Sequence, residues 1–429
     1  MPLIVPRAEP KTVTVRVVVA VVIFHGSNYK LRGAMLKTTP FHARTAALCV
    51  SHAWRRWSGH VVASSYELTH EREYNAIRSA AALFDVSPLY KYLIEGKDAA
   101  RLLDRIVPRD VARAAVGQVL YTPWCDAAGK VIDDGTIARL AEQRFRMTCA
   151  DPGLRWLQDN ALGLQVSIRD VSTASAALAL QGPCAREILQ RICDADLSAL
   201  KYFRIFGTQL DGIAVEISRT GYTGDLGFEI WVEASLALPL WDALHAAGRH
   251  YGMVPAGMLA LDLARLEAGL MLIDVDYVSA RRALIASQTS TPFELDLAWA
   301  VNLNKESFIG REALARESKA APAWQFVGVE LDWDSFERLH AEAGLAPRVP
   351  SAAWRMSVPI YAGAQQAGYA TSGGWSPLLK KYIALAHLRA AWAAPGTALD
   401  MEITVEHQRK RALARVVKKP FFDPERKRA

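Results

Sequence analysis

The sequence predicts an α+β fold for most of the chain, followed by a small all-β domain at the C-terminal end. Helical and strand-like patterns alternate up to about residue 318, without the long parallel runs of a doubly wound sheet. Beyond that point the pattern changes to short strands between Gly and Pro turns, which is typical of a small sandwich or barrel. The length of 429 residues is enough for two or three domains with sizeable cores.

The first part of the chain is predicted to contain two helices and a hairpin. Leu68, Ile77 and Ala81 lie among charged residues at spacings that suit one buried helical face. Gly129 stands at the tip of a turn between two strand-like runs, which indicates a β-hairpin. The elements predicted here are a helix over 67–83, a strand over 90–94, a helix over 97–106, strands over 119–122 and 136–140, and a strand over 145–149.

The middle of the chain repeats this order in outline, and the C-terminal part contains only strands. The middle elements are a strand over 176–180, a helix over 185–192, strands over 207–210, 213–219 and 228–232, and helices over 234–248 and 258–268. The C-terminal strands are predicted over 326–331, 358–361, 367–371, 383–386 and 401–405. Residues 1–34 read poorly as the start of a globular domain, so we expect an N-terminal extension that is disordered or a mis-called start.

The composition excludes several classes of protein. With 51% hydrophobic and 22% charged residues, the chain is neither disordered nor fibrous. The five cysteines form no Cys-x-x-Cys pair, which argues against a disulfide framework and a cysteine-bound metal, so we expect reduced cytoplasmic thiols. No segment reaches the ~18–20 apolar residues that cross a bilayer, so no membrane partner is expected.

The net charge of +7 comes from the C-terminal segment 407–429, which has nine Lys and Arg residues against two acids. A basic tail can bind nucleic acid or an acidic partner, but a solvated terminus is commoner, and it is the interpretation we adopt. Nucleic-acid binding is therefore not expected.

A glycine-rich motif is the first candidate for chemistry. Gly221, Gly224 and Gly227 stand at spacing three, which allows tight turns and close approach of the backbone to a flat ligand. Tyr222 can stack on a ring, and Glu229 can accept two hydrogen bonds from an amino-amidine edge. An ordinary glycine-rich hairpin is the alternative interpretation.

Charged residues form two further candidates. Asp133 and Asp134 enter a strand together, and an acid of such a pair that points into a cleft has a raised pKa and can move a proton. An exposed turn is the alternative. On a predicted helix, Asp262, Arg265 and Glu267 are spaced as surface ion pairs. No His-x-x-x-His or Gly-x-Ser-x-Gly motif is present, so neither a metal site nor serine hydrolysis is expected.

Six motifs, taken in order, resemble the glycine cleavage T-protein (aminomethyltransferase) family. The similarity extends from about residue 66 to the C-terminus. The motifs are Leu-Phe-Asp-Val-Ser at 83–87, the acid-containing run at 129–135, Ala-Leu-Gln-Gly-Pro at 179–183, the glycine motif at 221–229, Arg-Leu-Glu-Ala-Gly at 265–269 and Phe-Ile-Gly-Arg-Glu-Ala-Leu at 308–314.

The resemblance implies both a fold and an activity. The fold is a tetrahydrofolate-binding catalytic core of α+β lobes around a cavity, here 35–318, followed by a β-barrel, here 319–429. The activity is the transfer of a one-carbon unit from a small donor to the nitrogen of tetrahydrofolate. By motif, Asp133 matches the catalytic aspartate of the family. The cofactor-binding positions implied in the same way are Tyr121, Asp134, Tyr222, Glu229 and Arg265.

The chain departs from the family pattern on the expected donor side. It has Pro88 where the family has a histidine, and Ala150 followed by Asp151 where the family has a folate-binding asparagine. Ile273 stands where a tyrosine is expected, with Tyr277 nearby, and the stretch 57–66 also differs. The donor therefore stays open between a small amine and an aminomethyl group on a lipoyl carrier protein.

Two other hypotheses remain. The chain could be a tetrahydrofolate-dependent O- or S-demethylase, which would yield 5-methyl-tetrahydrofolate in place of the 5,10-methylene form. The demethylases that share this scaffold have a different residue in place of the first acid of the pair, which is intact here as Asp133. The third hypothesis is a non-catalytic folate-binding protein that uses its basic tail.

Overall fold

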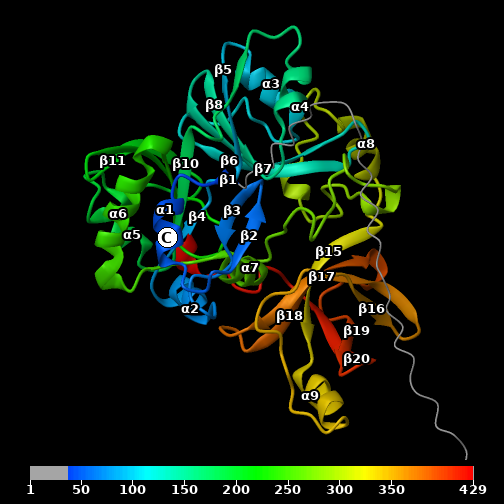
Figure 1. The fold of residues 1–429 in the computed structure, drawn as a ribbon. Helices are drawn as coiled ribbons and strands as arrows, with labels where there is room; N and C mark the ends of the chain where they lie inside the picture. The colour runs from blue at the N-terminus through cyan, green and yellow to red at the C-terminus, as the bar shows by residue number, and fades with distance from the viewer. Residues whose placement is uncertain (1–36, 429) are drawn as a thin grey trace, which may run out of the picture. The chain divides into compact units, whose positions relative to one another are not determined.

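In the computed structural model, which describes residues 37–428, the strands form three open sheets and one closed barrel (Figure 1). The predicted α+β class with a C-terminal barrel is confirmed. The expectation for residues 1–34 falls outside the described residues. Between residues 37 and 428, no helix has the length and apolar character needed to cross a membrane.

The five-stranded sheet has the order β6-β7-β8-β5-β9, and its neighbouring strands are antiparallel. Leu102 and Ile106 of the helix that follows β5 pack with Phe145 and Ile137 in one apolar cluster, so the helix covers one face of the sheet. The elements are β5 (Tyr90–Glu95), α3 (Ala99–Ile106), β6 (Val119–Cys125), β7 (Val131–Ala141), β8 (Arg144–Cys149), α4 (Leu154–Asn160) and β9 (Ser167–Asp170).

The six-stranded sheet has the order β11-β12-β13-β10-β4-β14, and only the β4–β14 pair is parallel among the described strands of this sheet. Leu180 and Phe228 on one of its faces pack against Ile188 and Trp241 of two helices. The elements are α1 (His42–Leu48), β4 (Ala82–Asp85), β10 (Ser175–Gln181), α5 (Ala185–Gln190), β11 (Ile205–Leu210), β12 (Ile213–Ser218), β13 (Gly227–Glu233), α6 (Ala237–Gly248) and β14 (Val254–Pro255).

The central core lies between these two sheets. Val119 and Val131 of the five-stranded sheet share one apolar cluster with Ala179 and Trp231 of the six-stranded sheet and with Leu263 of α7. Because this cluster joins both sheets, residues that line it are brought together from distant parts of the sequence. The remaining elements of this region are β1 (Lys37–Thr38), β2 (Trp54–Trp57), β3 (His60–Ala63), α2 (Glu71–Ser79), α7 (Met258–Glu267) and α8 (Arg311–Glu317).

The C-terminal barrel is closed by antiparallel pairing of its first and last strands. Buried and more exposed residues alternate along its strands, as the two faces of a barrel require. The sequence left a sandwich and a barrel open, and the pairing of β15 with β20 decides for the barrel. The elements are β15 (Trp324–Leu331), α9 (Trp333–Ala341), β16 (Val358–Ala362), β17 (Gln365–Ser376), β18 (Lys381–Arg389), β19 (Ala398–Val405) and β20 (Gln408–Val417).

Three predictions about elements are wrong. The prediction that the C-terminal part contains only strands misses the helix α9, which follows β15. The helix predicted over 67–83 ends at Ser79, and Ala82–Asp85 forms a strand because Leu83 is buried on one face of the sheet and Phe84 on the other. The C-terminal segment is not a solvated tail. Its residues 408–417 form β20, in which Ala412, Ala414 and Val416 face the barrel interior, while Leu413 and two arginines face outward.

Candidate active site

The acid pair lies on β7, where that strand runs between β6 and β8. Gly135 follows the pair at a point where β8 comes very close, since a Cβ there would lie 2.1 Å from the Thr148 carbonyl oxygen. A side chain at this position would push the two strands apart. The Asp-Asp-Gly sequence therefore fixes two carboxylates on a tightly packed sheet, and the alternative of an exposed turn is wrong.

Asp133 is buried, with 1% of its surface exposed. Its Oδ1 accepts a hydrogen bond from the Asp134 backbone N–H at 2.8 Å, and its Oδ2 accepts one from the Asp151 N–H at 3.1 Å. Burial raises the pKa of Asp133 well above its usual value, and the charge of Asp134 raises it further, although the two N–H groups act in the opposite direction. This carboxyl can therefore hold or accept a proton closer to neutral pH than an exposed aspartate can.

Asp134 is surrounded by tyrosines. Its Oδ2 accepts a hydrogen bond from the Tyr121 hydroxyl at 2.8 Å, and its Oδ1 accepts one from the Tyr277 hydroxyl. Burial raises the pKa of Asp134, and the two hydroxyls lower it. Burial also raises the pKa of each tyrosine, so both hydroxyls stay protonated and can donate hydrogen bonds. Both oxygens of Asp134 are thus occupied, and this residue fixes the two tyrosine side chains next to Asp133.

Arg265 is buried in the centre of the molecule, so the interpretation as a surface ion pair is wrong. Its Nε donates to Asp262 Oδ1 at 2.9 Å, and its Nη1 donates to Asp276 Oδ2 at 2.6 Å. The other oxygen of Asp262 accepts a hydrogen bond from Arg355 Nε at 2.5 Å. Only about 1% of the Arg265 side chain is exposed, because α7 packs its apolar residues into the central core on several sides.

One nitrogen of Arg265 has no partner. Its Nη2 is buried and makes no hydrogen bond with any of residues 37–428. Burial raises the pKa of Tyr222; the charge of Arg265 opposes this and that of Asp134 adds to it, and Tyr222 in turn raises the pKa of Tyr121. The same part of the interior therefore contains Asp133 and Asp134, Tyr121 and Tyr222, and Arg265. A buried donor without an acceptor is costly unless a ligand supplies the acceptor.

Glu229 lies on β13 with different neighbours. Its Oε2 accepts a hydrogen bond from the Thr220 hydroxyl at 2.6 Å. Burial raises its pKa, while Thr220 and the positive charge of Arg146, on the neighbouring five-stranded sheet, lower it. The Arg146 guanidinium in turn lies 4.1 Å from the ring centroid of Trp231. Within residues 37–428, Glu229 makes no hydrogen bond to the acid pair.

The glycines of the 221–229 motif accommodate a protein side chain. A Cβ at Gly221 would lie 2.0 Å from the Oε1 of Gln181, and one at Gly227 would lie 2.2 Å from the same atom. Gln181 is fully buried and accepts a hydrogen bond from the Thr223 hydroxyl at 2.9 Å. These two glycines are therefore explained by the packing of Gln181. Gly224 has φ +72°, which favours glycine in the turn.

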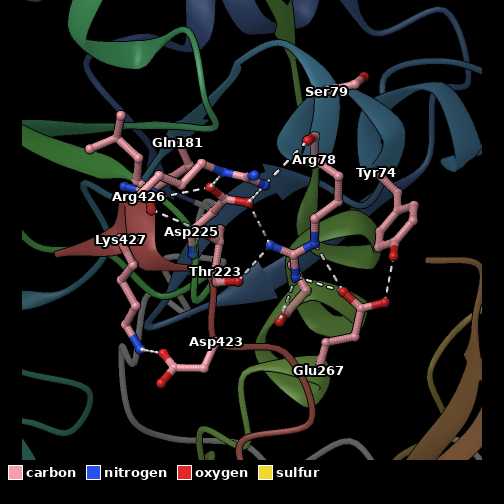
Figure 2. A network of polar contacts seen from close by, with 12 residues as sticks. Tyr74, Arg78, Ser79, Gln181, Thr223, Asp225, Glu267, Asp423, Arg426 and Lys427 are labelled. Atoms are coloured by element: carbon pink, nitrogen blue, oxygen red, sulfur yellow. Dashed lines mark hydrogen bonds and ion pairs between the residues drawn. The ribbon is translucent and has the colours of Figure 1, made fainter. Parts of the chain in front are cut away.

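A network of ion pairs and hydrogen bonds holds the glycine motif through Thr223 and Asp225 (Figure 2). The Arg78 guanidinium lies between Glu267, at 2.6 Å, and Asp225, at 3.4 Å, and it also donates to the Thr223 carbonyl. Arg426 near the C-terminus binds Asp225 at 2.7 and 2.8 Å. The glycine motif is thus tied to two helices and to the end of the chain, which restricts its movement.

The structure brings residues to the site that the sequence did not assign to it. Tyr277 and Asp276 follow Arg-Leu-Glu-Ala-Gly within about ten residues, and the tyrosine near that motif was the available signal. Arg282 binds Asp151 at 2.8 Å, and the Ser58 hydroxyl donates to the Ala150 carbonyl at 3.1 Å. The segments around residues 58, 150 and 277, which depart from the family pattern, therefore meet beside the acid pair.

Comparisons with known proteins cover nearly all of the described residues. A family model described as the GCVT N-terminal domain matches residues 40–305, and the glycine cleavage T-protein C-terminal barrel domain matches residues 343–423. The chain is 35% identical to an aminomethyltransferase of Moorella thermoacetica over 91% of this chain and 98% of that protein. It is 34% identical to one from Geobacillus thermodenitrificans over 90% and 99%.

A solved structure shows the same arrangement of elements. The glycine cleavage system aminomethyltransferase T from Bartonella henselae is 26% identical, with a TM-score of 0.76. The similarity covers 90% of this chain and 98% of that one. Core and barrel are therefore both shared with this structure.

Proposed function

We propose, from the premise that this chain belongs to the glycine cleavage T-protein family, that it is a tetrahydrofolate-dependent aminomethyltransferase. The relatives named above are aminomethyltransferases, and the chain matches them over almost their whole length. The observation that carries the proposal is the buried Asp133 carboxyl with its raised pKa, in the same interior as the unpartnered Arg265.

The residues present suit a reduced pterin as substrate. The unpartnered Nη2 of Arg265 can donate to a ring oxygen or nitrogen, and Tyr222 is close enough to Arg265 for its charge to act on the pKa of that arginine. Glu229 is a carboxylate that can accept two hydrogen bonds from the amino-amidine edge of a pterin. We assign Tyr121 and Asp134 to the same binding site, since they are hydrogen-bonded to each other beside Asp133.

Tetrahydrofolate, when bound, supplies a nucleophilic nitrogen that takes up the one-carbon unit. We assign to Asp133 the role of a general base that accepts the proton released from a folate nitrogen. As the carbon becomes bonded to the folate nitrogens, its bonds to the donor break, and the departing amine, together with the thiol in the case of a lipoyl carrier, takes up the protons that those nitrogens lose. Its two backbone N–H contacts hold the carboxylate in one orientation, so little reorganisation is needed when the proton moves. The tyrosines bound to Asp134 hold the neighbouring side chains in place and exclude water from the acid pair.

The same proposal covers the domains and the donor. We place the catalytic core at 35–318 and the barrel domain at 319–429, which is supported by the end of α8 at Glu317 and the start of β15 at Trp324. We assign the donor to the aminomethyl class, either a small amine or an aminomethyl group on a lipoyl carrier protein. The Bartonella henselae structure belongs to a glycine cleavage system, which supports this class.

The test is a panel of donors with tetrahydrofolate, in which the folate product is identified by mass. An aminomethyl donor should yield the 5,10-methylene form. Asp133→Asn should lower turnover by about 10²-fold or more, because general base catalysis is lost while the side chain keeps its size. Asp170→Asn, exposed on β9 of the same sheet, is the matched control and should keep normal turnover.

Two results would contradict the proposal. Formation of 5-methyl-tetrahydrofolate from ether or sulfonium donors alone would favour the demethylase hypothesis. Turnover of Asp133→Asn within about twofold of the wild type would remove Asp133 from the chemistry.

A further inference from the structure

Arg282 binds the segment that holds the Asp133 carboxylate. Its Nη2 lies 2.8 Å from Asp151 Oδ2, in an ion pair whose side chains are 44% and 27% exposed. The Asp151 backbone N–H donates to Asp133 Oδ2 at 3.1 Å. A further contact of this segment is the hydrogen bond from the Ser58 hydroxyl to the Ala150 carbonyl, at 3.1 Å. A displacement of Asp151 would therefore reach Asp133 through the backbone.

The same nitrogen binds the turn that holds Asp134. Arg282 Nη2 donates to Asp274 Oδ1 at 2.8 Å. The Asp274 backbone N–H donates to the Tyr277 carbonyl at 2.8 Å, and the Tyr277 hydroxyl donates to Asp134. Asp274 has φ +64°, a left-handed conformation that is uncommon for a residue with a side chain, so a contact that fixes its carboxylate helps to hold this turn. One guanidinium thus connects the supports of both acids.

The backbone on both sides of Arg282 is attached to the strand that carries the acids. The Ala280 N–H donates to the Val131 carbonyl, and the Val131 N–H donates to the Ser290 carbonyl, both at 2.8 Å. Val131 begins β7, two residues before Asp133. The segment that carries Arg282 therefore starts and ends beside the acid pair, which keeps its guanidinium within reach of the two aspartates that it binds.

Charged and titratable groups from several elements surround Asp133. They are Asp134 on the same strand, Tyr121 on β6, Cys149 on β8, Asp151 after β8, and Tyr277 and Arg281 on the segment 274–281. Burial raises the pKa of Asp133, and the charges of Asp134 and Asp151 raise it further, while the backbone N–H groups of those two residues lower it. Burial also raises the pKa of Asp151, whereas the charge of Arg282 lowers it and that of Asp274 raises it. Loss of the Arg282 charge would leave Asp151 without this opposing charge, so the pKa of Asp133 would rise.

We propose that Arg282 is a positioning residue for the acid pair, which ties the segment that holds Asp133 to the turn that holds Asp134. The inference rests on the proposed function, because it concerns the proton that Asp133 accepts. Arginine suits this place, since its planar guanidinium can bind two carboxylates at once in a fixed geometry. Arg282 acts through Asp151 and Asp274 and needs no contact with the substrate.

The first test measures the pKa of Asp133 without any substrate. Infrared difference spectra of the full chain over a pH series, with the spectra of Asp133→Asn subtracted, follow this carboxyl group. Arg282→Gln should raise its pKa by about 0.5 or more. Arg169→Gln is the matched control, because this arginine is in an exposed ion pair with Glu95 on the same sheet and should leave the pKa unchanged. An unchanged or lowered pKa in Arg282→Gln would overturn the inference.

A double variant tests whether Arg282 acts through Asp151. Asp151→Asn keeps the backbone N–H and removes the charge, so in this background Arg282→Gln should change the pKa of Asp133 by less than half as much as in the wild type. An equal change in both backgrounds would show that the contact with Asp151 does not carry the effect, and it would overturn the positioning role.

Turnover with an aminomethyl donor connects the inference to the reaction. In Arg282→Gln the fall in rate should move to higher pH by the same amount as the pKa of Asp133, which lowers turnover by about threefold at a pH below both values. The KM for tetrahydrofolate should change by less than about twofold. A loss of rate that is equal at every pH would overturn the inference. If no donor yields 5,10-methylene-tetrahydrofolate with the wild type, the proposed function fails, while the infrared spectra still decide the role of Arg282.

Discussion

At the scale of single residues, two neighbouring carboxylates have different surroundings. Within residues 37–428, Asp133 accepts hydrogen bonds only from backbone N–H groups, whereas Asp134 accepts them from two tyrosine hydroxyls. Burial raises the pKa of both acids; the two hydroxyls oppose this at Asp134, whereas the charge of Asp134 raises the pKa of Asp133 further. This difference suits the separate roles that we propose for the two acids, proton transfer for Asp133 and positioning of the tyrosines for Asp134.

This difference predicts the pH dependence of the reaction. A general base must be deprotonated, so the rate should fall as the pH is lowered through the pKa of Asp133, which lies well above the usual value of about 3.9. Asp134→Asn removes the neighbouring charge, so the pKa of Asp133 should fall and the loss of rate should move to lower pH. Single-turnover rates between pH 4 and 8 measure both profiles. An unchanged profile, or a shift to higher pH, would contradict this role for Asp134.

The sequence could predict some of these residues and not others. Asp133 and Arg265 stand in recognisable motifs, so the sequence alone singles them out as candidates. The contact of Tyr277 with Asp134 joins residues 143 positions apart, and no local pattern reveals such a contact. The Asp262–Arg265 spacing was interpreted as a surface pair because spacing shows which residues share a helical face, but not which face is buried.

At the scale of elements, the turn at residues 274–277 connects the core to the barrel. Asp276 Oδ1 accepts hydrogen bonds from the hydroxyls of Thr371, at 2.5 Å, and Ser372, at 2.8 Å, both on β17. Its other oxygen binds Arg265, and its backbone carbonyl lies 2.6 Å from His387 Nε2 on β18. The barrel therefore positions the turn that carries Tyr277, and it acts on the site through Asp276.

Substitutions at this turn should have graded effects on stability. Asp276→Ala leaves the buried guanidinium of Arg265 with one acid fewer, so we expect a loss of about 3–5 kcal/mol in the free energy of unfolding. Thr371→Val removes one neutral donor and should cost about 1 kcal/mol. Arg282→Gln, in an exposed ion pair, should cost less than about 1 kcal/mol. Urea unfolding measures all three, and equal losses would refute the role of Asp276 as the connecting residue.

The sequence predicted best those helices and strands whose apolar residues recur with one clear period. Strands over 90–94 and 145–149 and the helix over 97–106 match β5, β8 and α3 closely. The errors fall where burial overrides the local pattern. Strand β4 is apolar on both faces, and it followed a helical pattern without a break. Strand β20 has three consecutive basic residues near its start and Leu413 at an exposed position, so its inward face does not stand out from the sequence.

At the scale of the whole molecule, the chain end returns to the core. The Phe422 backbone N–H donates to the Glu267 carbonyl at 2.9 Å, and the Phe422 ring lies 4.4 Å from the Arg78 guanidinium. Arg426 then binds Asp225, the fully buried acid of the glycine motif. Core, barrel and C-terminal segment therefore share buried polar contacts, and such contacts are costly to break one at a time.

This connection predicts that the molecule unfolds as a unit and that its last residues matter. Arg426→Met leaves the Asp225 carboxylate with the longer contact to Arg78 and one hydrogen bond from the Leu226 backbone N–H, so we expect a loss of about 1.5–3 kcal/mol in the free energy of unfolding. Arg428 lies two residues after Arg426 and forms an exposed ion pair with Asp423. Arg428→Met is therefore the matched control and should lower the free energy of unfolding by less than about 1 kcal/mol. Denaturant unfolding followed by circular dichroism and by tryptophan fluorescence should give coincident transitions in the wild type and in both variants. Separate transitions in the wild type, or equal losses in the two variants, would show that the C-terminal segment does not link the barrel to the core.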